Sequence, residues 1–450
     1  MFRKLGQVMA SWSFKYLPDP SIFAVLLTFI AFGLGLALTN TTPLQMVVNW
    51  YKGFWELLTF SMQMALMVIT ASAVANAPLV RGWIAKIAAT PKNSSHAVYM
   101  IALISIAISI LHWGLALVLG SLLAKEVAKS LRKRSIPFEY GLMGAAAYLG
   151  QMTWHGGPSA SIGLLIATPG HFLEKQIGVI PISDYMFNPV NIAVTILCLV
   201  LPPFFAWMIH PKPEEIKPLD ADVAAYLDKD DAPAKAVAAA EQTLGDRLNN
   251  SWLIAFLLGT LGTVYIVYHF VTKGFALDLN IVNAIFFFAG IYLHGTMANY
   301  VKAVKDATGG VSGIIFQFPL YAGIMGIVRY SGLVDVMSKA IVGFSSEYMF
   351  YFWTFIMASI VNLFVPSGGG QWVVQGPIAM KSAELMHASY IKTALAVAYG
   401  NTWTNMLQPF WAIALLGITG LKARDVIGYA TAVMILSFVV FALPLLFLPA

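Results

Sequence analysis

Four short polar stretches interrupt otherwise apolar segments of the chain, and we call them breaks 1 to 4. Their members, break by break, are His112, Trp113 and Gly114; Thr153, Trp154, His155, Gly156, Gly157, Ser159 and Ser161; Asn362, Ser367, Gly368, Gly369, Gly370 and Gln371; and Trp403, Thr404, Asn405 and Gln408. Hydroxyls, carboxamides and backbone amides can hold a small ion without a charged side chain. Glycine allows close backbone approach and left-handed dihedral angles. These residues are therefore our candidate binding residues.

The composition predicts that these breaks lie within a membrane protein. Of 450 residues, 59% are hydrophobic and only 11% are charged, which is typical of a polytopic α-helical membrane protein surrounded by a lipid bilayer. The net charge of +6 does not indicate nucleic acid binding, because the basic residues are scattered among short loops. The single cysteine, Cys198, excludes an internal disulfide framework.

Break 3 lies in an uncharged run from Tyr348 to Met380, which is too long for one straight crossing of about 20 residues. Pro366 and three consecutive glycines in its middle are unfavourable in a continuous helix. We therefore predict a re-entrant hairpin at 348–380, made of two half-helices that meet at a polar tip. Break 1 interrupts a similar run, which predicts a second hairpin at 93–124. A kinked transmembrane helix is the alternative for each run.

Each break residue also has a structural interpretation. Ser, Thr and Asn often hydrogen-bond one membrane helix to another. His112 and His155 are the only titratable side chains in the breaks, and either could be a hydrogen-bond partner or a proton carrier. The same breaks could also bind a sodium ion. The tryptophans beside the breaks could pack or line a pocket: Trp113, Trp154, Trp372 and Trp403. Four polar clusters at matched positions favour a binding site.

The order of spans and breaks is similar on the two sides of a hydrophilic segment. We predict a first repeat at 1–209 with four spans and the hairpin 93–124, a cytoplasmic linker at 210–250, a joining span at 251–271, and a second repeat at 272–450 with four spans and the hairpin 348–380. Most of the 27 basic residues fall on one side only if 93–124 begins and ends on that side. The repeats are then inverted, with the N-terminus cytoplasmic and the C-terminus periplasmic. The fold class predicted is an all-α polytopic membrane protein with an inverted structural repeat, two re-entrant hairpins and broken helices.

Enzyme signatures are missing from the sequence. It contains no Gly-x-Ser-x-Gly, His-Glu-x-x-His or phosphate-loop motif, and no pair of carboxylates within an apolar span. We therefore predict that the protein is not an enzyme and needs no cofactor.

Several motifs resemble those of the bacterial short-chain fatty acid transporter family, which is associated with acetoacetate and butyrate. The motifs are Leu17-Pro-Asp-Pro20, Phe60-Ser-Met-Gln-Met-Ala65, Val365-Pro-Ser-Gly-Gly-Gly370 with Gln375-Gly-Pro377, and Gln408-Pro-Phe-Trp411. The resemblance covers nearly the whole chain. By analogy with wider groups of two-hairpin ion transporters, it implies an elevator-type carrier in the bacterial inner membrane. A coupling cation, either proton or sodium, and a homo-oligomer are expected partners.

The charge of the breaks then favours a class of substrate. None of them contains Lys or Arg, and a helix N-terminus supplies only about half a positive charge. One carboxylate could be held in this way, whereas a second would need bound cations. We therefore expect a secondary active transporter of short-chain monocarboxylates that works by alternating access. A carrier for di- or tricarboxylates, an uncoupled channel and an intramembrane enzyme are the alternatives.

Overall fold

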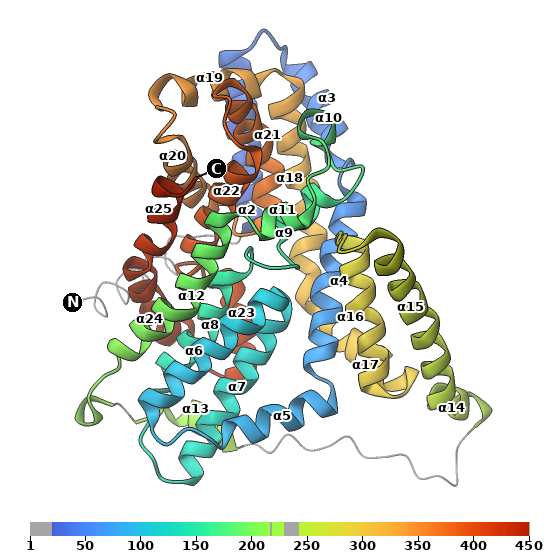
Figure 1. Ribbon diagram of the computed structural model, residues 1–450, viewed down its shortest axis with the longest axis vertical. Helices are drawn as coiled ribbons and strands as arrows, with labels where there is room; N and C mark the ends of the chain where they lie inside the picture. Colours follow the sequence, from blue (N-terminus) through green and yellow to red (C-terminus); the bar gives the residue numbers. More distant parts are fainter. Residues whose placement is uncertain (1–19, 217, 229–242, 450) are drawn as a thin grey trace.

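The computed structural model describes residues 20–216, 218–228 and 243–449, and every regular element in these ranges is a helix (Figure 1). The elements before the linker are α2 (Pro20–Leu38), α3 (Pro43–Phe54), α4 (Leu58–Ala75), α5 (Pro78–Ala88), α6 (Ser94–Leu111), α7 (Trp113–Lys133), α8 (Tyr140–Tyr148), η1 (Leu149–Thr153), α9 (Ser161–Ala167), α10 (Glu174–Ile177), α11 (Ile182–Met186) and α12 (Pro189–Met208). The all-helical prediction is confirmed for this part of the chain.

The linker and the joining span follow. They contain η2 (Pro213–Glu215), α13 (Ala221–Asp228), α14 (Leu244–Asn249) and α15 (Trp252–Lys273). The last group of elements is α16 (Leu279–His294), α17 (Met297–Thr308), η4 (Gly309–Val311), α18 (Ser312–Tyr330), α19 (Leu333–Phe344), α20 (Phe350–Asn362), α21 (Gly368–Leu385), α22 (Tyr390–Asn405), α23 (Pro409–Thr419), α24 (Ala423–Leu436) and α25 (Phe438–Phe447).

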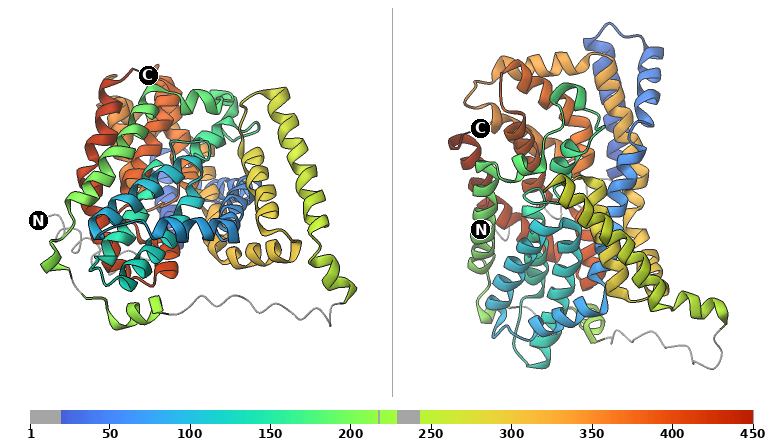
Figure 2. Two further views of the ribbon diagram at one scale, coloured as in Figure 1. Left: turned by 60° about the horizontal axis from the view of Figure 1, so that its bottom comes forward. Right: turned by 45° about the vertical axis from the view of Figure 1, so that its right-hand side comes forward.

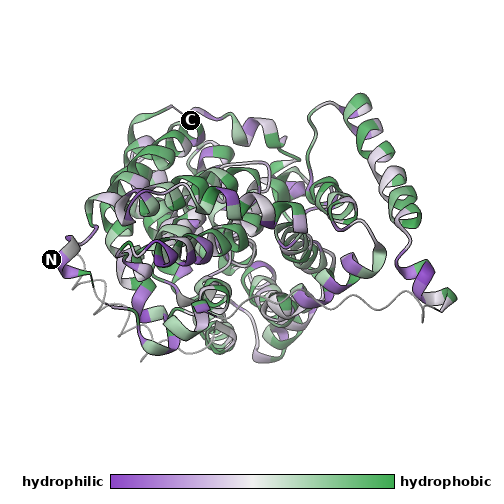
Figure 3. Cartoon of the chain, turned by 90° about the horizontal axis from the view of Figure 1, so that it is seen from below, coloured by the Kyte–Doolittle hydropathy of each residue, from purple (hydrophilic) through white to green (hydrophobic). Residues whose placement is uncertain are grey.

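Within the described residues, seven helical stretches are long and apolar enough to cross a membrane. They are Ser21–Leu38, Leu58–Ala75, Ser94–Leu111, Pro189–Met208, Trp252–Lys273, Met297–Tyr330 and Ala423–Phe447. Helix α15 lies at one edge of the bundle, where it packs on α16 (Figures 1 and 2). Apolar residues cover most of α15, and Leu261 and Val271 on it are exposed (Figure 3). Such a surface suits lipid rather than water, so the protein is a membrane protein.

Local sequence accounts for many helix ends. The side chains of Asn93, Ser367 and Ser389 accept hydrogen bonds from backbone amides in the first turns of α6, α21 and α22. Helix α16 ends at Gly295, which has a positive φ of 72°. Asn and Ser at N-caps and Gly after the last turn are the residues that best satisfy the free backbone groups of helix ends.

The chain reverses direction at breaks 1 and 3. His112 is both the last cap of α6 and the first cap of α7, and the two helices pack side by side. The outer ends of α6 and α7 lie at the bottom of Figure 1, whereas those of α20 and α21 lie at the top. Both runs are thus hairpins of helices, although α7 continues to Lys133, beyond the predicted limit at residue 124.

The helices form two groups by their contacts. The frame helices are α2–α5 with α15–α19, and most of them pack on one another, whereas α5 and α19 pack mainly on the core helices α7 and α21. The core helices, α6–α12 with α20–α25, hold both hairpins and all four breaks. The groups meet where α4 and α5 touch α7, and where α18 and α19 touch α21.

Part of the predicted linker is folded onto the core helices. Val223 and Leu227 of α13 are buried, and the Tyr226 hydroxyl donates to the carbonyl oxygen of Gly417 at 2.9 Å. These three residues share one helix face because they are three and four positions apart. Ion pairs join Asp228 to Arg132 at 2.9 Å and Asp220 to Lys422 at 3.3 Å.

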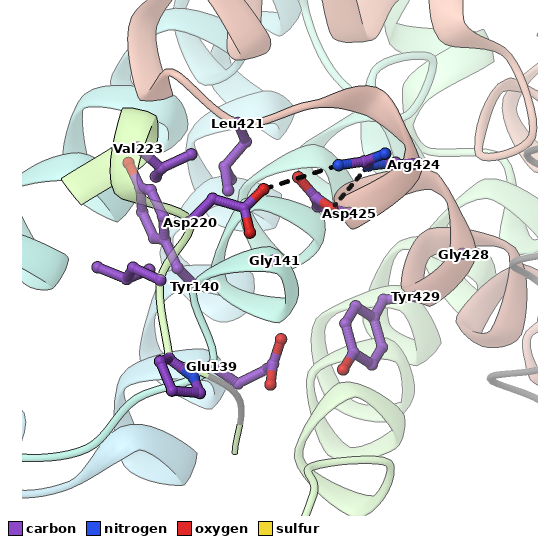
Figure 4. A pocket seen from close by; sticks show the side chains of 12 residues that line it. Glu139, Tyr140, Gly141, Asp220, Val223, Leu421, Arg424, Asp425, Gly428 and Tyr429 are labelled. Atoms are coloured by element: carbon purple, nitrogen blue, oxygen red, sulfur yellow. Dashed lines mark ion pairs between the residues drawn. The ribbon is translucent and has the colours of Figure 1, made fainter. Parts of the chain in front are cut away.

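A cavity of about 180 Å³ lies beside α13 (Figure 4). Asp220, Arg424 and Asp425 meet at its rim, with Glu139 and Tyr429 facing it. The α13 part of the linker is therefore not simply solvated, because an apolar stripe and three ion pairs hold it against both halves of the core helices, whereas residues 243–250 with α14 are exposed. Residues 229–242 lie outside the described residues.

Candidate functional site

Breaks 3 and 4 form a closed network of carboxamides. The Nδ2 atom of Asn362 donates to the Asn401 carbonyl oxygen, to Thr404 Oγ1 and to Asn405 Oδ1, each at 3.0 Å. Asn401 Nδ2 donates to Asn362 Oδ1 and to Gln371 Oε1, both at 2.7 Å. All of these side chains are buried. A satisfied buried network of this kind fixes the positions of its members strongly.

The end of α20 is held by the same break. Gln408 Nε2 donates to the carbonyl oxygens of Asn362 at 3.1 Å and Leu363 at 2.9 Å. The last carbonyl oxygens of a helix receive no hydrogen bond within that helix. A side-chain donor there therefore removes the cost of burying them. Gln408 thereby ties the tip of the second hairpin to the break between α22 and α23.

The three glycines of break 3 face different neighbours. A Cβ atom added to Gly368 would lie 2.6 Å from His155 Nε2 and 2.8 Å from Ser161 Oγ. The same atom on Gly369 would lie 2.8 Å from Phe60 Cζ, and on Gly370 it would lie 2.8 Å from Tyr321 Cδ2. Any larger residue at these positions would force a neighbouring side chain or the tip itself to shift.

Contrary to the expectation from sequence, left-handed dihedral angles do not explain these three glycines. Positive φ angles occur among the described glycines at 170, 178, 274, 295, 332 and 420, and so not at the tip. Gly368, Gly369 and Gly370 instead form the first turn of α21, where Ser367 Oγ accepts from the Gly370 amide at 3.2 Å. Close approach is thus the physical reason for glycine at this tip.

Breaks 1 and 2 meet in a similar way. The Trp113 amide donates to Ser159 Oγ at 3.1 Å, and Thr153 Oγ1 donates to the Ile106 carbonyl oxygen at 2.8 Å.

A Cβ atom on Gly157 would lie 1.7 Å from the Ile110 carbonyl oxygen, so α6 and break 2 approach at backbone distance. Asn191 Nδ2 donates to the Gly156 carbonyl oxygen at 2.9 Å. A Cβ atom on Gly114 would be 3.3 Å from Ala71 Cβ of α4.

His155 links the two pairs of breaks. Its Nε2 atom lies 3.4 Å from Asn401 Oδ1 and faces Gly368, which belongs to break 3. Its Nδ1 atom is buried without a hydrogen-bond partner. Contacts therefore join the four breaks, break 1 to break 2 through Ser159 and break 2 to breaks 3 and 4 through His155, in a buried region whose break residues include no Lys, Arg, Asp or Glu. Neutral donors and acceptors are the only polar groups that this region offers to a ligand.

Aromatic rings pack beside this region. Trp113 and Trp154 have ring centroids 5.3 Å apart, and Trp411 lies 5.5 Å and 5.4 Å from them. Trp372 is fully buried in α21. Trp403 is placed elsewhere, because its Nε1 atom donates to the Met434 carbonyl oxygen at 2.7 Å and its ring packs on Phe355 and Phe438. The structure gives Trp403 a packing environment away from the other break residues.

Some residues of the site were not among the sequence candidates. Asn401, at the start of break 4, was not among the named binding residues although it sits at the centre of the carboxamide network; its spacing of three and four from Thr404 and Asn405 is the signal that could have included it. Gln151 in η1 is buried with both side-chain polar atoms unpartnered. Phe60 of α4 and Phe318 of α18 come from the frame helices; Phe60 begins one of the family motifs, but that motif does not assign it to the site.

Comparisons with known proteins agree with this architecture. The profile of the short chain fatty acid transporter family matches residues 1–448. A relative from Haemophilus influenzae, which carries a provisional name as a short-chain fatty acid transporter, is 38% identical over 462 residues and covers 100% of both chains. One from Escherichia coli K12 with the same name is 37% identical over 453 residues and covers 99% of both.

A solved structure shares the fold. The Alcanivorax borkumensis YdaH transporter, described as having an unusual topology, matches with a TM-score of 0.55 at 13% identity, covering 95% of this chain and 96% of that chain. The family and the relatives are named as transporters, so the protein is not an enzyme. Since the family profile and two relatives above one-third identity cover essentially its full length, this chain belongs to the short-chain fatty acid transporter family.

Proposed function

We propose that the protein is a secondary active transporter that carries short-chain monocarboxylates such as butyrate and acetoacetate across the bacterial inner membrane by alternating access. The observation that carries this proposal is the chain of buried contacts that joins all four uncharged breaks next to a cluster of tryptophans. One carboxylate suits neutral donors and the start of α21, and a short acyl chain suits the aromatic rings.

The break residues have distinct roles in this proposal. The tip of α21, at Ser367, Gly368, Gly369 and Gly370, receives the carboxylate together with His155 and Ser161. Asn362, Gln371, Thr404, Asn405 and Gln408 hold that tip in place. The first hairpin tip, at His112, Trp113 and Gly114, plays the corresponding part with break 2.

The coupling cation is a proton or a sodium ion. Among the described residues there is no cluster of three His, Cys, Asp or Glu side chains able to hold a metal ion. A sodium site at the breaks would thus consist of neutral oxygen atoms, which hard cations accept as ligands. His155 and His112, whose Nδ1 and Nε2 atoms respectively are buried without a hydrogen-bond partner, are the break residues available to carry a proton.

We further propose an inverted repeat and an elevator-type movement. The two hairpins enter from opposite ends of the molecule, which supports repeats at 1–209 and 272–450 joined by 210–250 and the span 251–271 (Figure 1). The core helices would move against the frame helices, carrying the breaks with them. A homo-oligomer assembled through frame helices would provide a fixed support for that movement.

The orientation follows from charge. Lys125, Arg132 and Lys422 lie at the end of the molecule that holds α13, and an excess of Lys and Arg marks the cytoplasmic side. We therefore place the linker and the N-terminus in the cytoplasm and the C-terminus in the periplasm. The N-terminal residues 1–19 lie outside the described residues.

Cysteine labelling tests this orientation. In a Cys198→Ser background, we expect Lys92→Cys and Lys133→Cys to react with an impermeant thiol reagent only from the cytoplasmic side, and Tyr348→Cys and Leu385→Cys only from the periplasmic side. All four positions are exposed in the structure. Labelling of residues 92 and 133 from opposite sides would contradict the first hairpin and the inverted repeat together.

A transport assay tests the substrate class. In proteoliposomes, labelled butyrate uptake should saturate, accelerate with butyrate on the far side, and respond to an imposed sodium or proton gradient. Acetoacetate should compete at least tenfold more effectively than succinate or citrate, because a second carboxylate finds no compensating charge in the site. Succinate competition equal to that of butyrate would favour the di- or tricarboxylate alternative, and uptake without acceleration would favour a channel.

A further inference from the structure

The glycine tip of α21 touches the frame helices through aromatic rings. Phe60 of α4 and Phe318 of α18 are stacked, with ring centroids 5.6 Å apart and planes at 28°. A Cβ atom on Gly369 would lie 2.8 Å from Phe60 Cζ and 3.7 Å from Phe318 Cζ. Both rings are buried, with only 7% and 2% of their residue surfaces exposed. The tip therefore lies directly against an apolar surface that belongs to the other group of helices.

Phe60 also borders a cavity. This cavity of about 520 Å³ lies between α4, α9 and α16, and its walls include Leu165 and Leu279 as well as the charged residues Glu56, Lys175 and Arg329. Phe60 thus touches both the cavity and the glycine tip. The Phe60 side chain is therefore the contact that the cavity and the glycine tip share.

The tip is polar on one side and apolar on the other. Gly368 faces His155 and Ser161, whereas Gly369 faces the two phenylalanines. Helix geometry leaves the amides of Gly368 and Gly369 without acceptors within α21, and the nearby His155 Nδ1 atom is buried and unpartnered. A carboxylate held by these groups would direct its acyl chain away from the polar side, toward Phe60 and Phe318.

We infer that Phe60 and Phe318 form the wall against which the acyl chain of the substrate lies, and that their bulk limits the chain length accepted. The inference rests on the proposed function. Shortening Phe60 removes the wall between the tip and the cavity, which provides room for additional methylene groups. Phe60 is then a specificity-determining residue supplied by the frame helices.

Competition against labelled butyrate in proteoliposomes measures this limit. In the wild type, hexanoate should compete at least tenfold more weakly than butyrate, since even one extra methylene group commonly changes discrimination by about 10- to 200-fold. Phe60→Ala should improve hexanoate relative to butyrate by tenfold or more. Phe316→Ala is the matched control, because this residue lies two positions from Phe318 on α18 and is 63% exposed. An unchanged ratio in Phe60→Ala, or equal competition by both acids in the wild type, would overturn the inference.

A labelling measurement separates this inference from the transport function. With Ser367→Cys as the only cysteine in detergent-solubilised protein, Phe60→Ala should raise the rate of thiol modification at least tenfold, and Phe316→Ala should not. If the wild type takes up butyrate but Phe60→Ala changes neither the competition ratio nor the labelling rate, then the proposed role of Phe60 is wrong and the transport function still holds. Absent butyrate uptake in the wild type would overturn the proposed function, while the labelling rates would still decide whether Phe60 separates the cavity from the tip.

Discussion

Replacing Gly369 with valine should reduce butyrate uptake to background while leaving the protein inserted in the membrane. The added Cβ atom would lie 2.8 Å from Phe60 Cζ, so the tip of α21 must move away from the frame helices or the Phe60 ring must shift. Either change disturbs the first turn of α21, where the carboxylate is proposed to bind. Uptake in proteoliposomes, together with the yield of monodisperse protein, measures the two effects separately.

Two further variants make this result specific. Gly33→Val is the matched control, because a Cβ atom at this helical glycine of α2 meets nothing within 4 Å, and we expect nearly normal uptake. Phe60→Ala combined with Gly369→Val should restore part of the uptake, since it removes the atoms that clash. Normal uptake by Gly369→Val alone would reduce the tip to an ordinary packing contact.

Replacing Asn401 with leucine should lower butyrate uptake at limiting substrate by about 100-fold or more. The change removes both hydrogen bonds of 2.7 Å that Asn401 Nδ2 donates to Asn362 and Gln371. Each buried acceptor left without a partner costs about 1–3 kcal/mol, and about 2.8 kcal/mol corresponds to 100-fold. The lost bonds connect α22 to both arms of the second hairpin, so the tip should lose its position before the bundle unfolds.

The adjacent residue provides the control for Asn401. Thr402 is equally buried on α22, but its Oγ1 atom has no hydrogen-bond partner. Thr402→Val should therefore leave uptake within about threefold of the wild type, because it removes a hydroxyl whose loss leaves no neighbour unsatisfied. Thermal unfolding of both variants shows how much of any loss is due to stability. Similar uptake by Asn401→Leu and Thr402→Val would contradict a role for the carboxamide network.

Much of the architecture is local in origin and follows from the sequence alone. Long uncharged runs predict membrane helices, and Pro366 with the following glycines predicts where the second run must reverse. Break 1 gives the first hairpin in the same way. These features depend on hydropathy and on backbone preferences within a few residues, so they are visible without knowledge of distant contacts. The family motifs and the lack of enzyme signatures are local as well.

The composition of the site was decided by the tertiary structure. His155 and Asn401 meet although they are 246 positions apart, and Phe60 approaches Gly369 from a different group of helices. Trp403 shows the converse, because it adjoins Thr404 in sequence but packs toward Phe438 on another side of α22. Successive helical residues point about 100° apart, and only the packing of α20 and α25 determines which of them faces the site. The reason glycine is required at 369 is likewise a contact made across the fold, not a backbone angle set by its neighbours.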